Sequence, residues 1–83
     1  MKYIIIEELN LEMAILFDEC LTHSAMAGNN KVISAGFCYI SQAQNKNGEP
    51  EIMVVTIGTS ISLNKCSQPG DAEIIKRSIT FST

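Results

Sequence analysis

The sequence lacks long apolar runs: none of its uninterrupted apolar stretches, among them Tyr3–Ile6 and Met13–Phe17, exceeds five residues. A helix that crosses a membrane needs roughly 18 apolar residues in succession, so we expect no membrane-spanning segment. The first residues also lack the apolar stretch and small-residue cleavage site of a secretory signal peptide. A chain of 83 residues fits one domain, and we predict a single domain over residues 1–83.

Cysteine is scarce as well, and an odd number of three widely spaced cysteines argues against a disulfide framework. Reduced thiols fit a cytoplasmic protein better, which predicts a cytoplasmic location. A structural zinc site needs four ligands, usually in two close pairs. Cys20 and His23 form one such pair, but Cys38 and Cys66 are too far apart in the sequence to form the second. Because phosphate-binding glycine motifs are also absent, we expect no metal and no other cofactor.

Positive charge is limited: the chain has six Lys and Arg residues against nine Asp and Glu residues, and its net charge is −3. Proteins that bind nucleic acids normally present a basic stripe to the phosphates, so nucleic acid is not an expected partner. The acids concentrate in residues 1–28, which contain five acids and one base. Acids at strand ends commonly serve only to keep an edge solvated. The functional interpretation is an acidic contact patch for a protein with a basic surface, made by Glu7, Glu8, Glu12, Asp18 and Glu19.

The apolar pattern predicts an α+β fold with the order strand, strand, short helix, strand, strand, helix. Lys2–Glu8 contains three successive isoleucines, whose β-branched side chains favour a strand. In Glu12–Asp18, alternation places Met13, Ile15 and Phe17 on one face. The short connection between these strands predicts an antiparallel hairpin.

A short helix is expected within Leu21–Gly28, with Thr22 as the N-cap and Gly28 at its end. Lys31–Gln42 then reads as a long strand, in which Gly36 indicates a bulge or a close approach of another backbone. The alternation predicts one face with Ile33, Ala35, Phe37 and Tyr39, and an opposite face with Val32, Ser34, Gly36, Cys38 and Ile40.

The turn signal Asn47-Gly48 predicts a second hairpin, with Glu51–Ile57 as the returning strand. Gly58 interrupts this strand, and Thr59–Leu63 is expected to continue it after a kink. The last element is predicted to be a helix that packs on one face of the antiparallel sheet.

For this last helix, Ser67 is the expected N-cap and Pro69 the first-turn residue. Its buried stripe would consist of Ala72, Ile75 and Ile79, with Ile74 at the edge. Asp71 is expected near the positive end of the helix dipole.

The segment DECLTH, residues 18–23, places Cys20 three residues before His23. A catalytic thiol needs a partner that favours the thiolate, and histidine is the usual one. However, Asp18 and Glu19 raise the pKa of a neighbouring thiol. We therefore interpret Cys20 as a small half-buried residue and His23 as a surface residue, and we predict no catalytic residue. A small thiol enzyme or ligand binder that uses Cys20 and His23 is the alternative.

Three stretches, LTHSAMAG, VISAGFCYI and SISLNKCSQPGDAEII, resemble a pattern found in short uncharacterised bacterial proteins, some of them encoded in prophage regions. The resemblance implies a small mixed α+β protein of accessory type, and it assigns no activity. Together with the acidic patch, it predicts a non-enzymatic interaction module that binds, and by binding inhibits, a host protein. Two copies that join sheet edges would also protect the strands, which makes a homodimer a further expectation. A phage structural or assembly component is the third interpretation.

Overall fold

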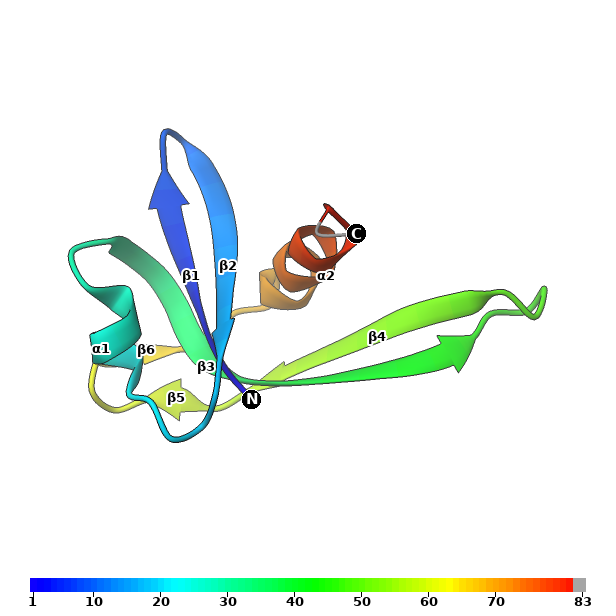
Figure 1. Cartoon of the computed structure of the whole chain (residues 1–83). Helices are drawn as coiled ribbons and strands as arrows, with labels where there is room; N and C mark the ends of the chain where they lie inside the picture. The colour runs from blue at the N-terminus through cyan, green and yellow to red at the C-terminus, as the bar shows by residue number, and fades with distance from the viewer. Residues whose placement is uncertain (82–83) are drawn as a thin grey trace.

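The computed structural model describes residues 1–81 and shows a small α+β fold (Figure 1). Four antiparallel strands form the main sheet in the order β2-β1-β3-β4, and two short strands, β5 and β6, form a second sheet. This confirms the predicted fold class. The strands are β1 (Lys2–Glu8), β2 (Leu11–Phe17), β3 (Lys31–Gln44), β4 (Pro50–Ile57), β5 (Thr59–Ser60) and β6 (Lys65–Cys66), and the helices are α1 (His23–Ala27) and α2 (Asp71–Phe81).

The main sheet carries an apolar cluster on each face, and β1 contributes to both. On one face, Ile4 and Ile6 pack with Phe17 and Ala35 against Ala27 of α1. On the other face, Tyr3 and Ile5 pack with Cys38 against Ile75 of α2. A strand that is covered on both sides needs apolar side chains at successive positions, which is why the isoleucine run occurs in β1.

A bulge in β3 moves two side chains to faces opposite to those predicted. Ile5 of β1 pairs with Ser34 and Ile6 pairs with Val32, so Ile33 is the extra residue. Val32 therefore packs with the cluster of Ala35, whereas Ile33 packs with the cluster of Tyr3. The predicted faces of Val32 and Ile33 were wrong.

Gly36 marks a close backbone approach, one of the two expected reasons for a glycine in this strand. A Cβ atom at this position would lie 2.6 Å from the carbonyl oxygen of Ile57. No side chain larger than hydrogen fits at that distance, so glycine is required opposite the end of β4.

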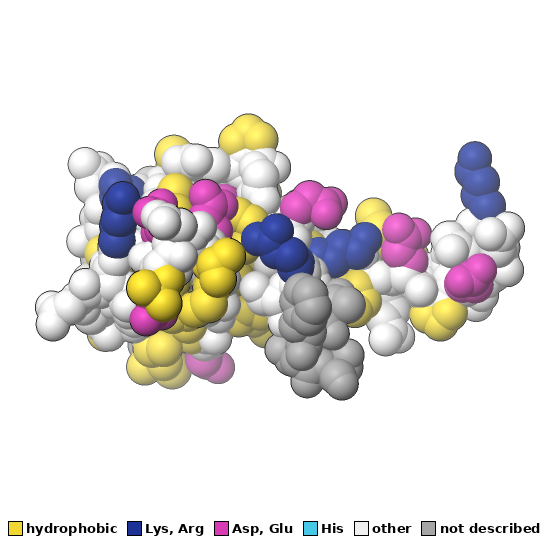
Figure 2. Space-filling model, turned by 90° about the horizontal axis from the view of Figure 1, so that it is seen from above, with side chains coloured by type: hydrophobic (Ala, Val, Ile, Leu, Met, Phe, Trp, Pro, Cys, Tyr) yellow, Lys and Arg dark blue, Asp and Glu magenta, His cyan; other side chains and the backbone are white. Residues whose placement is uncertain are grey.

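Strand β3 is longer than its partner β1, and this extra length creates a projecting arm. Lys31–Phe37 pairs with β1, and Phe37–Gln44 pairs with β4. Beyond Phe37 the two strands leave the body of the molecule as a hairpin, which we call the arm (residues 38–56; Figures 1 and 2). The predicted turn at its tip is confirmed: Gly48 has a φ of 77° and donates its N–H to the carbonyl of Asn45.

The connection after β4 differs from the prediction. Gly58 ends β4 with a φ of 87°, as expected. However, only Thr59–Ser60 continues as a strand, and it pairs with Lys65–Cys66 instead of extending the main sheet. Residues 61–64 form the turn between these two short strands.

The two helices begin for different reasons. The hydroxyl of Thr22 accepts a hydrogen bond from the N–H of Ala25 at 3.1 Å, which confirms the predicted N-cap of α1. Gly28 ends α1 at a φ of 55°. In contrast, α2 begins at Asp71, so the predicted N-cap Ser67 was wrong and Pro69 lies before the helix. No helix in residues 1–81 is long and apolar enough to cross a membrane.

Candidate functional site

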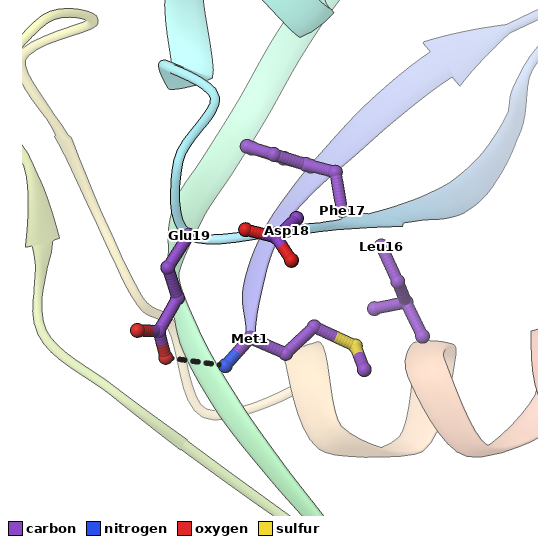
Figure 3. A pocket seen from close by; sticks show the side chains of 5 residues that line it. All are labelled: Met1, Leu16, Phe17, Asp18 and Glu19. Carbon is purple, nitrogen blue, oxygen red and sulfur yellow. Dashed lines mark hydrogen bonds and ion pairs between the residues drawn. The ribbon is translucent and has the colours of Figure 1, made fainter.

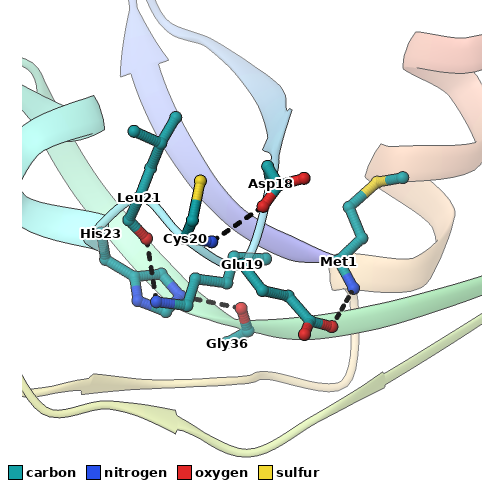
Figure 4. Close-up of polar contacts among 8 residues, drawn as sticks. Met1, Asp18, Glu19, Cys20, Leu21, His23 and Gly36 are labelled. Carbon is teal, nitrogen blue, oxygen red and sulfur yellow. Dashed lines mark hydrogen bonds and ion pairs between the residues drawn. The ribbon is translucent and has the colours of Figure 1, made fainter.

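Cys20 and His23 do not form a catalytic pair in the structure. His23 is the first residue of α1, and its ring is buried between the edges of Phe17 and Phe37. Its Nε2 atom lies 2.8 Å from the carbonyl oxygen of Gly36, which makes that nitrogen the donor. The interpretation of His23 as a surface residue was wrong. Figure 4 shows the Cys20 sulfur pointing away from this ring.

The thiol of Cys20 is exposed, not half-buried. Its hydrogen bond to the Asp18 carboxylate, followed by repulsion from that charge, raises the pKa of the thiol. Conversely, the backbone N–H of Cys20 donates to Asp18 Oδ1 at 2.8 Å and lowers the pKa of Asp18. A raised pKa reduces the fraction of thiolate, the form that a nucleophile requires.

The five acids predicted to form one contact patch lie at the two ends of the β1–β2 hairpin. Glu7 and Glu12 pair directly across the strands beside Glu8, at the hairpin tip. Asp18 and Glu19 follow the far end of β2, a full seven-residue strand away, which is about 20 Å. The structure therefore brings the acids together as a group of three and a group of two.

Both acidic groups have partners within the chain. Lys31 lies 3.6 Å from Glu7, which offsets the repulsion between the opposed Glu7 and Glu12. At the other end, the N-terminal ammonium of Met1 lies 3.0 Å from Glu19. Each of these ion pairs is largely exposed and therefore contributes little to stability. They do reduce the net negative charge that either group presents to a partner.

An open pocket of about 470 Å³ lies next to the second acidic group, and Asp18 and Glu19 form part of its wall (Figure 3). Met1, Leu16 and Phe17 supply the apolar part of its lining. The N-terminal ammonium of Met1, paired with Glu19, and the carboxylate of Asp18 are the charged groups of this lining. Within residues 1–81, no group of three or more His, Cys, Asp and Glu side chains is arranged to hold a metal ion.

A buried polar cluster that sequence reasoning missed connects α2 to the sheet. Asp71, the first residue of α2, is buried and accepts hydrogen bonds from the Tyr3 hydroxyl at 2.5 Å and from the Ser34 hydroxyl at 2.7 Å. The backbone N–H of Gln68 donates to the same carboxylate at 2.9 Å. Burial, and then the hydrogen bond to Asp71, raises the pKa of the Tyr3 phenol. The cluster is closed and fully hydrogen-bonded, so it anchors the helix and offers no access to a substrate.

An apolar stripe on the arm is the other feature that sequence reasoning missed. Tyr39 pairs with Val55 and Phe37 pairs with Ile57, so their side chains lie on the same face of the hairpin. The exposed members are Tyr39 (60 %), Val55 (52 %), Ile57 (47 %) and Met53 (46 %). We call these four residues the arm stripe. Helix α2 packs on the opposite face, where Cys38 and Val54 belong to its apolar cluster.

The sequence contains the apolar residues of the arm stripe, but their pattern does not show which face of the strand is exposed. Residues 51–57 are apolar at both odd and even positions, which is typical of a strand covered on both faces. In the structure α2 covers only one of these faces at the base of the arm. The exposed face therefore depends on how far the hairpin extends beyond its neighbours.

No protein-family model matches this sequence, and neither the curated proteins nor the solved structures compared with it give a match. The geometry of the described residues is therefore the basis for any functional assignment.

Proposed function

We propose that this protein is a non-enzymatic interaction module that contacts another protein through the arm stripe. The observation that carries the proposal is the exposure of Tyr39, Met53, Val55 and Ile57 on one face of a hairpin that projects from the body. Isolated apolar residues on a surface are ordinary, but a contiguous exposed group marks an interaction site. The arm that carries this group is a narrow projection (Figure 2).

The energetic scale supports a binding role for the stripe. Complete burial of such a side chain is favourable by about 1.5–3 kcal/mol, so covering the exposed half of each would contribute about 1 kcal/mol. Aromatic residues and methionine are enriched in the cores of protein interfaces, and the stripe contains Tyr39 and Met53. A stable interface buries roughly 800 Å² on each partner, so the contact must extend beyond these four side chains.

The acidic hairpin tip is a second, separate surface: Glu7 pairs with Lys31 at the far end of β1, whereas Lys2 pairs with Phe37 at the base of the arm. Glu8 and Glu12 lie beside Glu7 and are free of the Lys31 ion pair described above. Charges that lie outside a contact still accelerate association with a partner of opposite sign. The partner we propose is therefore a basic protein with an apolar contact surface. The accessory role in a phage or mobile element, and the inhibition of a host protein, rest on the resemblance stated above.

Two double variants test the proposal. Tyr39→Ser with Val55→Thr removes apolar area from the stripe but keeps residues compatible with a strand. Glu8→Lys with Glu12→Lys reverses charge at the hairpin tip. Each protein is immobilised and exposed to a bacterial lysate, and the captured proteins are identified by mass spectrometry.

We expect the stripe variant to lose the partner that the unmodified protein captures, and the tip variant to retain it with slower association. Circular dichroism and thermal melting confirm that both variants are folded. If the stripe variant still captured the partner and the tip variant did not, the contact would be assigned to the acids of the hairpin tip. Equal capture by all three proteins would reject both surfaces.

A further inference from the structure

The two edges of the main sheet are protected to different degrees. At the β2 edge, the backbone N–H of Ala14 donates to the hydroxyl of Ser78 in α2 at 3.4 Å, and the strand contains the charged Glu12. Strand β4 forms the other edge; its one charged residue, Glu51, and its proline, Pro50, lie at its outer end, and residues 52–57 have neither a charge nor a proline. Natural edge strands usually carry such residues because an uncharged edge pairs readily with another strand.

The register of the arm shows which backbone groups β4 presents at this edge. The N–H of Asn45 donates to the carbonyl of Glu49, so these two residues form a hydrogen-bonded pair. Hydrogen-bonded and non-hydrogen-bonded pairs alternate along an antiparallel ladder. Counting from Asn45 and Glu49, the outward N–H and C=O groups of β4 belong to Ile52, Val54 and Thr56. Pro50, which lacks an N–H, also falls on the outward series at the outer end of the strand.

These outward groups are complementary to themselves. We propose that two copies of the chain pair antiparallel along β4, about a twofold axis at Val54. In that register Val54 exchanges two hydrogen bonds with Val54 of the second copy, and Ile52 exchanges two with Thr56 of the second copy. All three outward residues are then used, and Pro50 lies outside the paired region.

The same register joins the two arm stripes. Met53 lies opposite Val55 of the second copy, and Tyr39 lies opposite Val55 within its own chain. The result is an apolar surface that continues across the axis on one face of the sheet. Glu51 lies opposite Ile57 of the second copy, so the pairing brings no like charges together.

A second copy fits this edge well because the outward backbone groups of β4 are complementary to themselves. The pairing satisfies each outward group with the equivalent group of an identical chain, as an isologous interface requires. A strand with proline at a paired position would leave a carbonyl of this edge unpaired, because proline has no N–H. The inference deepens the proposed function, because it rests on the arm as an interaction surface and makes that surface twofold.

Sedimentation equilibrium from micromolar to millimolar concentration tests the association. We expect a monomer–dimer equilibrium in the unmodified protein. Ile52→Pro removes one outward N–H that the β3–β4 ladder does not use, so it is expected to keep the fold and to weaken dimerisation at least tenfold. Ser41→Lys is the control, because Ser41 lies opposite Met53 in β3, away from the β4 edge.

A cross-linking measurement tests the register. In a Cys20→Ser, Cys66→Ser background, Val54→Cys places two thiols opposite each other, with Cα atoms about 5.5 Å apart in a hydrogen-bonded pair. Mild oxidation is expected to yield a covalent dimer. Met53→Cys is the control, since equivalent residues 53 are offset by two positions along the strands and lie too far apart for a disulfide.

A monomer at all concentrations, an open polymer, or cross-linking that favours residue 53 would overturn this inference. Unchanged association of the Ile52→Pro variant, with its fold verified by circular dichroism, would do so too. None of these results bears on partner capture by the arm stripe. Conversely, loss of capture without loss of the dimer would leave this inference standing and reject the proposed function.

Discussion

Replacing Tyr3 with phenylalanine is expected to destabilise the protein by about 1.5–3 kcal/mol, the usual range for a hydrogen bond to a charged group. The Tyr3 hydroxyl donates to Asp71 at 2.5 Å, both residues are buried, and the ring of Tyr3 itself keeps its packing in the variant. The loss of stability therefore comes from the buried Asp71 carboxylate, which keeps only its hydrogen bonds from Ser34 and Gln68. For a domain of this size the change lowers the melting temperature by roughly 6–24 °C.

The same contact predicts how stability changes at alkaline pH. Because the pKa of Tyr3 is raised in the folded state, the folded protein keeps the phenolic proton to a higher pH than the unfolded chain does. The contribution of Tyr3 is complete below the unfolded pKa of about 10 and is lost as the pH rises above it. Above pH 10 the folded state binds one more proton than the unfolded state, so the free energy of unfolding falls by about 1.4 kcal/mol per pH unit. Tyr3→Phe removes this component of the slope.

Tyr39→Phe is the matched control, because it removes the same hydroxyl from an exposed ring. Urea unfolding of the three proteins, measured at one protein concentration between pH 7 and pH 11, gives the stabilities and the slopes. Tyr39→Phe should match the unmodified protein within about 0.5 kcal/mol at neutral pH. Equal stabilities of the two variants, or the same alkaline slope in Tyr3→Phe as in the unmodified protein, would refute the role assigned to the buried cluster.

Two further predictions concern Gly36 and Cys20. Gly36→Ala should cost about 1–3 kcal/mol in urea unfolding, because its Cβ would lie 2.6 Å from a backbone oxygen of Ile57. Gly70→Ala, where no atom lies within 4 Å of the added Cβ, should cost less; the reverse order would contradict the close approach. Asp18→Asn should speed the alkylation of Cys20 severalfold at pH 8, because Asp18 raises the pKa of that thiol. Peptide mapping by mass spectrometry measures this rate, with the exposed Cys66 as internal reference, and an unchanged rate would show that Asp18 does not control the thiol.

Local signals in the sequence predicted most of the elements correctly. Alternation in β2 identified both of its faces, and Asn47-Gly48 identified the turn of the arm. Thr22 was recognised as an N-cap because its hydroxyl acts on a neighbouring residue. These features depend on interactions within a few residues, which a pattern in one sequence records.

The errors arose where distant contacts decide the structure. Ser67 followed by Pro69 is a credible helix start, yet α2 begins at Asp71, whose carboxylate is held by Tyr3 and Ser34 of the sheet. His23 was expected to be a surface residue. The structure buries it, and the carbonyl of Gly36, thirteen positions away, accepts a hydrogen bond from its ring.

The candidate sites follow the same division. Because Asp18 and Glu19 follow Glu7 and Glu8 closely in the chain, they were predicted to form one acidic patch. The extended strand β2 instead separates the two groups in space. The arm stripe depends on how far β3 continues past the end of β1, a difference in strand length that apolar periodicity does not record.

The placement of β1 at the centre of the sheet has a consequence for synthesis on the ribosome. Its isoleucines leave the ribosome early, whereas Ile75 and Asp71, which cover and anchor one of its faces, follow the whole sheet in the chain. Until α2 docks, that apolar face is open to other nascent chains, and contacts between such distant positions form slowly. Chaperone dependence during translation should therefore decrease only when the last helix has emerged.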